Sequence, residues 1–131
     1  MSVFSVIGIA GTGATVYRKW LDAVSDNIAN LNTVRATSDA AYQEKRVIAE
    51  PMPGGGVQVA GVLAGSSAQG KLVYEPTHPL ADADGMVRYP DVDLSSEMTQ
   101  LIMAQRGYQA NLSSVDRARE AYQAALQLGR G

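Results

Sequence analysis

Small or apolar residues recur in alternating steps of three and four at both ends of this chain, and this spacing constrains the fold more than any other feature. The first series is Ile7, Ala10, Ala14, Tyr17, Leu21, Val24, Ile28 and Leu31. Such spacing places its members on one face of an α-helix. A helix over residues 7–31 would be about 37 Å long. Its predicted end is marked by Asn27, Asn30 and Asn32, because asparagine favours turns.

A second helix is predicted over residues 94–128, with a length of about 52 Å. Asp93 is the expected N-cap, and Glu97 in the first turn suits the positive end of the helix dipole. Two neighbouring rows follow: Leu94, Met98, Leu101, Gln105, Tyr108, Leu112, Val115, Arg119, Tyr122 and Leu126, and Leu101, Ala104, Tyr108, Asn111, Val115, Ala118, Tyr122 and Ala125. Together they form a face wider than a two-stranded coiled coil needs.

The middle of the chain has the alternation and turn signals of short strands. Strands are expected at residues 42–49, 57–63, 71–74 and 86–89, with a turn at the Pro- and Gly-rich residues 51–56. The predicted fold is mainly α with a small β insert, in which long terminal helices pair as a coiled-coil-like core around a short antiparallel β region. The segments are an N-terminal axial helix (1–33), a β-rich insert with loops (34–92) and a C-terminal axial helix (93–131).

Composition excludes several classes of function. The 131 residues suit one domain, and 11 basic against 13 acidic side chains provide no basic stripe for nucleic acid. The absence of cysteine removes disulfides and thiolate metal sites. No apolar run is long enough to insert in a membrane, and no secretory signal is visible at the start. We therefore expect no cofactor, no metal site and no direct membrane insertion.

Single motifs provide only weak evidence for catalysis or for ligand binding. Gly11-Thr12-Gly13 suggests a dinucleotide-binding turn, but Val16 stands where the third glycine should be. His78 is the only histidine, and we expect it to bond a backbone carbonyl within its loop. Asp82 and Asp84 lack the rest of a calcium loop and are better explained as turn residues. No catalytic residue is predicted, and the chain is not expected to be an enzyme.

Two such long helices have no globule to wrap around, so their apolar faces need other chains. A helix pair alone leaves much of the broad C-terminal face exposed. We therefore expect the free chain to have frayed ends that order on assembly. A soluble coiled-coil adaptor is the alternative, and it would form a discrete small oligomer.

Four segments resemble the flagellar axial proteins, which are the rod, hook and hook-associated proteins. Residues 25–33 (SDNIANLNT) resemble the S-N-N-I-A-N-x-N-T signature near their N-terminus. Residues 90–98 and 102–111 resemble the V-D-x-x-x-E-M and R-x-Y-Q-A-N elements of their C-terminal helix. Residues 74–85 resemble the Y-x-P-x-H-P-x-A-D-x-x-G stretch of the short proximal rod proteins. Another hook or rod component is the alternative within the family.

The resemblance implies a structural subunit of the basal-body rod, a helically assembled drive shaft that carries torque from motor to hook across the periplasm. It implies export without a cleaved signal through the flagellar export apparatus. The implied partners are copies of itself, other rod proteins and the rod-to-membrane-ring adaptor.

Subunit contacts are expected along both helices. The predicted interface residues are Ile7, Ala10, Ala14, Tyr17, Leu21, Val24, Asn27, Ile28, Asn30, Leu31, Met98, Leu101, Ala104, Tyr108, Asn111, Leu112, Val115, Tyr122 and Leu126. Asn27 and Asn30 either end the first helix or bond neighbouring subunits. Asn111 lies mid-helix, where asparagine is disfavoured, so we expect it to fix register between subunits.

Overall fold

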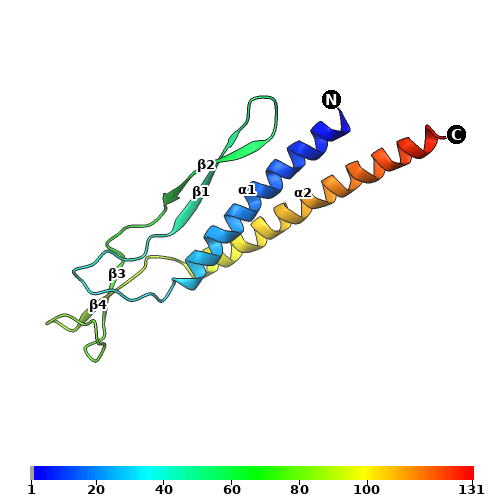
Figure 1. Cartoon of the computed structure of the whole chain (residues 1–131). Coiled ribbons are helices and arrows are strands. Elements are labelled where there is room, and N and C mark those ends of the chain that lie inside the picture. The colour runs from blue at the N-terminus through cyan, green and yellow to red at the C-terminus, as the bar shows by residue number, and fades with distance from the viewer. Residues whose placement is uncertain (1) are drawn as a thin grey trace.

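Two long helices joined by two β-hairpins make up the computed structural model, which describes residues 2–131 (Figure 1). The elements are α1 (Val3–Ala29), β1 (Lys45–Pro51), β2 (Val57–Ala64), β3 (Lys71–Tyr74), β4 (Met86–Tyr89) and α2 (Leu94–Leu128). This arrangement confirms the predicted fold class. Strands β3 and β4 lie at the predicted residues, whereas the first strand begins at Lys45 rather than at residue 42.

The ends of the helices follow local capping chemistry. Ser2 caps α1, because its hydroxyl accepts a hydrogen bond from the amide of Ser5 at 3.2 Å. The helix therefore begins before residue 7, which was its predicted start. It ends at Ala29 with Asn30 as the C-cap, so the predicted range 7–31 was wrong by a few residues at each end. The predicted cap of α2 is confirmed, since the Asp93 carboxylate accepts from the amide of Ser96 at 2.8 Å. The Gly11-Thr12-Gly13 run lies inside α1 and forms no nucleotide-binding turn.

The helices run antiparallel along the whole length of α1 (Figure 1). At one end the rings of Phe4 and Tyr122 meet edge to face, with centroids 5.2 Å apart. At the other end the side chains of Asn27 and Glu97 are hydrogen-bonded. Helix α2 is the longer one, so its last residues continue beyond the start of α1 with exposed side chains.

Close approach of the helices depends on Gly107. A Cβ atom there would overlap the ring of Tyr17. We expect Gly107→Ala to lower the free energy of unfolding by about 1–3 kcal/mol, the usual cost of overpacking. Gly11→Ala is the matched control, since a Cβ there meets nothing within 4 Å, and alanine should instead add about 0.5–1 kcal/mol. Urea denaturation of both variants checks this, and equal gains in stability would contradict the close contact.

Each hairpin has a different position on the helix pair. Strands β1 and β2 pair antiparallel, with a bulge between Ile48 and Ala49, and lie along α1. The Thr12 hydroxyl fixes this hairpin near its turn by accepting from the amide of Val57 at 3.1 Å. The β3–β4 hairpin lies at the opposite end of the molecule from the two chain termini (Figure 1).

The core within one chain is thin. Its buried apolar residues are Ala14, Ala23, Val24, Ala41, Val87, Val92 and Ala104, of which four are alanines. Many large apolar side chains on both helices and both hairpins are exposed instead. Over residues 2–131, neither helix has an apolar stretch of the length and hydropathy needed to cross a bilayer.

Candidate functional site

The broad face of α2 is divided into an inner and an outer part. The inner row, which includes Leu101, Ala104 and Val115, is buried or half-buried on the side of α2 that packs against α1. An apolar row beside it is left in solvent, and we call it the outer stripe. The outer stripe consists of Leu94, Met98, Ile102 and Leu112, which are 48%, 44%, 48% and 41% exposed.

The structure places the predicted interface residues in three groups. Buried within the chain are Ala14, Val24, Asn27 and Ala104. Half-buried, in α1, α2 and the turn after α1, are Ile7, Ala10, Tyr17, Leu21, Ile28, Asn30, Leu31, Leu101, Tyr108, Asn111, Val115 and Tyr122. Exposed are Met98, Leu112 and Leu126. Leu94 stands in the first predicted row but not among the predicted interface residues, whereas Ile102 stands in neither, although it follows Met98 by one helical turn.

Asn27 is the hydrogen-bonding centre of the end where helices and hairpins meet. Its side-chain oxygen accepts from the hydroxyl of Tyr42 at 2.9 Å and from the backbone amide of Lys45 at 2.8 Å. Its side-chain nitrogen donates to the carbonyl of Lys45 at 3.0 Å and to the carboxyl of Glu97 at 3.0 Å. One amide therefore joins α1 to β1 and α2. Asn27 is 1% exposed, so its hydrogen-bonding capacity is used within the chain.

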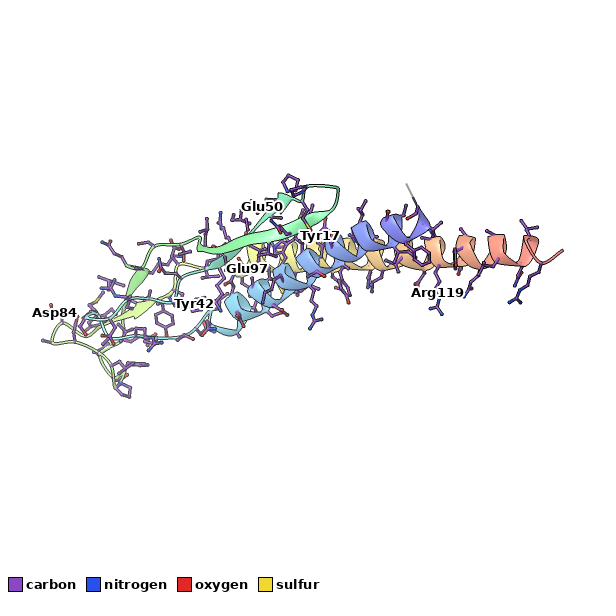
Figure 2. All side chains as sticks on the ribbon, turned by 45° about the horizontal axis from the view of Figure 1, so that its top comes forward. Tyr17, Tyr42, Glu50, Asp84, Glu97 and Arg119 are labelled. Carbon is purple, nitrogen blue, oxygen red and sulfur yellow. The ribbon has the colours of Figure 1, made fainter. Side chains whose placement is uncertain are left out.

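Glu97 is buried beneath this amide rather than free in the first turn of α2. Its side chain is 1% exposed, and Figure 2 shows Glu97 and Tyr42 in the part of the molecule where α1 ends. Burial raises the pKa of Glu97, and the neighbouring carboxylate of Glu44 raises the pKa further. Opposing effects come from the hydrogen bond donated by Asn27 and the charge of Arg46, which also pairs with Glu44 at 2.9 Å.

Folding stability should therefore depend on pH through Glu97. Since its pKa in the folded chain lies above the ordinary 4.5, the folded state binds this proton more tightly than the unfolded state. Its contribution should be largest below pH 4.5 and should decline as pH rises through the folded pKa. When the pH is lowered from about 8 to about 5, the free energy of unfolding should rise more in the unsubstituted chain than in the Glu97→Gln variant. Urea denaturation at both pH values measures this, and parallel pH profiles would contradict it.

The other two singled-out asparagines also make contacts within the chain. Asn30 donates from its side chain to the carbonyl of Asp26 at 2.9 Å, which supports the end of α1. Asn111 donates to the carbonyl of Gly107 at 2.8 Å, and its amide lies against Gly13. A Cβ at position 13 would overlap that amide. Asn111 therefore fills the small gap that glycine leaves between the helices, and its contact with other subunits stays a prediction.

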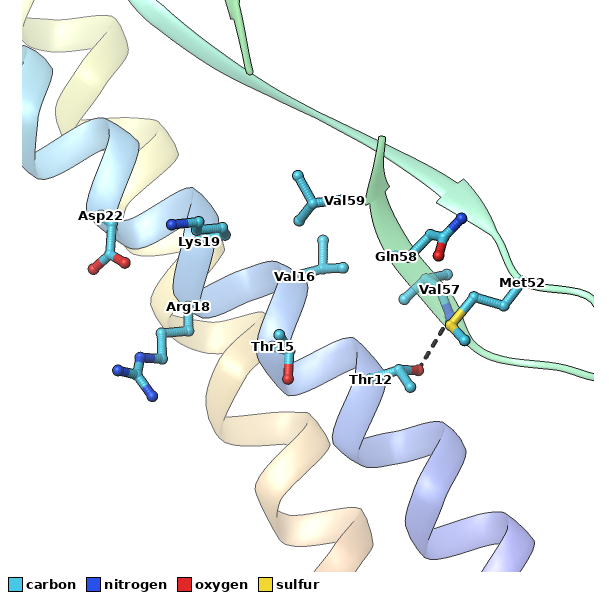
Figure 3. A pocket seen from close by; sticks show the side chains of 10 residues that line it. All are labelled: Thr12, Thr15, Val16, Arg18, Lys19, Asp22, Met52, Val57, Gln58 and Val59. Carbon is cyan, nitrogen blue, oxygen red and sulfur yellow. Dashed lines mark hydrogen bonds between the residues drawn. The ribbon is translucent and has the colours of Figure 1, made fainter. Parts of the chain in front are cut away.

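A groove of about 570 Å³ lies between α1 and the β1–β2 hairpin (Figure 3). Val16, Met52 and Val57 line it, with Thr12 bonded to the amide of Val57 at its floor. The side chains of Arg18 and Asp22 point away from the hairpin in this view. The groove brings together no nucleophile with a general base. Among residues 2–131, no three histidine, cysteine or acidic side chains are grouped closely enough to hold a metal ion.

The remaining singled-out residues serve their own loops. His78 does not bond a carbonyl as predicted; its Nδ1 accepts from the amide of Leu80 at 3.1 Å. Asp82 is confirmed as a turn residue, because one oxygen accepts from the amides of Asp84 and Met86. Asp91 pairs with Lys71 at 2.8 Å.

Comparison with known proteins agrees with this architecture. The family described as "Flagella basal body rod protein" matches residues 8–37, which form most of α1 and the turn after it. The family described as "Flagellar basal body rod FlgEFG protein C-terminal" matches residues 83–128, which comprise β4 and α2. One match thus covers most of the N-terminal helix, and the other covers the C-terminal helix.

Relatives that match over their full length indicate which kind of rod protein the chain resembles. The chain is 37% identical to the flagellar basal-body rod protein FlgC of Salmonella typhimurium, over 98% of this chain and 99% of the relative. It is 33% identical to FlgC of Borreliella burgdorferi over the whole of both chains, and 29% identical to FlgC of Bacillus subtilis over 99% and 100%. The chain therefore belongs to the flagellar basal-body rod proteins, which are structural subunits. Within that family, its similarity across the full length is to FlgC.

Proposed function

We propose that this chain, a structural subunit of the proximal rod of the flagellar basal body, assembles through the apolar surface that its own fold leaves uncovered. The observation that carries the proposal is the outer stripe of α2. Leu94, Met98 and Ile102 follow one another by one helical turn, and Leu112 lies on the same side of α2 ten residues further on, each more than two-fifths exposed. An exposed apolar surface beside an inner row that is already packed favours the binding of another chain.

Energetics support burial of the outer stripe by neighbours. Covering a large aliphatic side chain contributes about 1.5–3 kcal/mol before the entropy cost of association. The thin core of one chain leaves little surplus to hold the ends of two long helices in order. Neighbours on several sides would supply the missing burial, and contacts between unlike surfaces of successive copies would extend into a helical lattice.

The partners and location that we propose are those that the resemblance to flagellar rod proteins implies. The chain binds copies of itself and other rod proteins, with the rod-to-membrane-ring adaptor at the proximal end. It passes through the flagellar export apparatus without loss of a signal peptide and forms part of the rod across the periplasm. Residues 1–33 and 93–131 provide the axial helices, and residues 34–92 carry the outer β-hairpins. Its role is structural rather than catalytic.

Electron microscopy of purified basal bodies tests the proposal. The particles come from a strain in which this chain is the only version of this rod protein. We expect density for a helical array of two-helix subunits in the proximal rod, with the outer stripe in contact with a neighbour. A discrete soluble dimer or trimer that is absent from basal bodies would instead support the coiled-coil adaptor and overturn the rod assignment.

A further inference from the structure

The outer edge of β3 belongs to the small sheet and shares no residue with the outer stripe. The sheet consists of β3 and β4 alone, paired from Lys71↔Tyr89 to Tyr74↔Met86. All four residues of β3 are exposed, whereas β4 contains the fully buried Val87. The two edges of this sheet are therefore in different environments.

Other parts of the chain cover the β4 edge. Arg88 exchanges both of its backbone hydrogen bonds with Arg35, each at 2.9 Å. The amide of Met86 donates to the Asp82 carboxylate at 2.9 Å, and its carbonyl accepts from the amide of Asp82 at 3.0 Å. The backbone groups of Arg88 and Met86 thus point away from β3.

This geometry fixes the direction of the backbone groups of β3. In an antiparallel ladder, hydrogen-bonded and non-hydrogen-bonded pairs alternate. Since Arg88 and Met86 direct their groups away, their partners Leu72 and Tyr74 form non-hydrogen-bonded pairs. The amide and carbonyl of both residues therefore point toward the open edge. Within residues 2–131, none of these four groups has a hydrogen-bonding partner.

Apolar side chains accompany these unpaired groups. Leu72, Val73 and Tyr74 are 55%, 36% and 68% exposed. Proteins usually protect such an edge with charges, proline or a covering loop. Here the only charge on the strand is Lys71, which is already paired with Asp91, and Pro76 lies beyond the strand. Four backbone groups and three apolar side chains thus form a surface that matches another β-strand.

We propose that β3 receives an extended, basic segment of a neighbouring component of the assembly as an added strand. Charge favours this occupant over a second copy of the same edge. Residues 66–92 contain four carboxylates, at Glu75, Asp82, Asp84 and Asp91, but only two basic side chains. Of these two, Lys71 is paired with Asp91, and Arg88 donates to backbone carbonyls. Two identical acidic ends would repel one another, whereas a strand carrying lysine or arginine would be attracted.

Proline substitution tests backbone pairing directly. In Leu72→Pro the lost amide is one that points outward, so the β3–β4 ladder keeps its hydrogen bonds. Leu72→Ala is the matched control, because it truncates the side chain and keeps the amide. Both are introduced into the full-length chain, with native circular dichroism and thermal melting as evidence of folding. We expect Leu72→Pro to reduce the yield of assembled rods at least about tenfold and Leu72→Ala to reduce it much less.

Hydrogen exchange provides a second measurement that does not depend on the variants. The amides of Leu72 and Tyr74 should exchange rapidly in the free chain and become protected about 100-fold or more in purified basal bodies. Rapid exchange in the assembled rod, or normal assembly of folded Leu72→Pro, would overturn the proposal. Equal loss of assembly in the alanine and proline variants would show a side-chain contact and overturn strand addition.

The nature of the partner is tested separately. Asp84→Lys reverses an exposed charge near the sheet, and we expect it to weaken assembly. Unchanged assembly in this variant would overturn the basic character of the segment. Sedimentation of the concentrated purified chain tests whether two copies pair through this edge. A dimer that Leu72→Pro abolishes would overturn the proposed partner. Each variant retains the outer stripe, so failure of this inference leaves the proposed function intact.

Discussion

Replacing Asn27 with alanine is expected to lower the free energy of unfolding by about 3–5 kcal/mol, because the change leaves several buried groups without partners. The carboxyl of Glu97 would lose its donor, and the amide and carbonyl of Lys45 would lose both of their bonds to the side chain. The hydroxyl of Tyr42 would also lose its acceptor. Urea denaturation followed by circular dichroism measures the loss in the purified chain, without any assembly partner.

Asn30→Ala is the control for this prediction. Asn30 lies one helical turn or less from Asn27 and carries the same amide, but its nitrogen supports only the end of its own helix. We expect Asn30→Ala to cost about 1 kcal/mol or less. If Asn27→Ala left the monomer as stable as Asn30→Ala and blocked rod formation instead, Asn27 would act between subunits rather than within the chain.

The double variant Met98→Asp/Ile102→Asp should abolish rod assembly and leave the folded monomer almost unchanged. Both side chains are nearly half exposed, so an aspartate at either position can keep its carboxylate in solvent while the monomer loses only part of a side chain's burial. At a subunit interface, each would lose the burial of its exposed half, about 0.7–1.5 kcal/mol, and each new carboxylate would add a desolvation cost of at least about 1 kcal/mol. A combined loss of at least about 3 kcal/mol corresponds to more than about 100-fold in affinity. Counting rods in purified basal bodies and measuring export of the variant distinguish failed assembly from failed secretion.

Met103→Asp provides the matched control for the outer stripe. Met103 is 55% exposed on the same helix, but at about 100° per residue it lies on a different side from Met98. We expect a much smaller effect on assembly from this variant. Equal loss in both variants would mean that any apolar position on α2 suffices, and the outer stripe would no longer be a defined interface.

Periodicity predicted the architecture well because it is a local property of the chain. The cap at Asp93 and the strands at 71–74 and 86–89 are set by neighbouring residues, and they occur where the sequence places them. The start of α1 was missed because Ser2 caps the helix before the apolar series begins. Glycines in its first turns weaken a helix, but α2 packs against it and compensates.

The candidate site was less accessible from sequence, because it depends on which side of α2 the first helix covers. Two apolar rows were visible, and only packing decided that Leu101 and Ala104 face inward while Met98 faces solvent. The hydrogen bonds of Asn27 were also not visible, since they join residues 15 to 70 positions apart along the chain. Polar residues that bond far from their own segment carry no periodic signal.

The single amide that connects both helices to the first hairpin has a mechanical consequence. Apolar contacts are non-directional, so they resist a small change of angle between packed elements less than hydrogen bonds do. Hydrogen bonds have preferred angles and weaken steeply when they are bent. A twisting load on the helices would therefore reach the β1–β2 hairpin with little slip at the level of Asn27, where four such bonds converge on one side chain. In a rotating shaft, this position would set the torsional stiffness of each subunit.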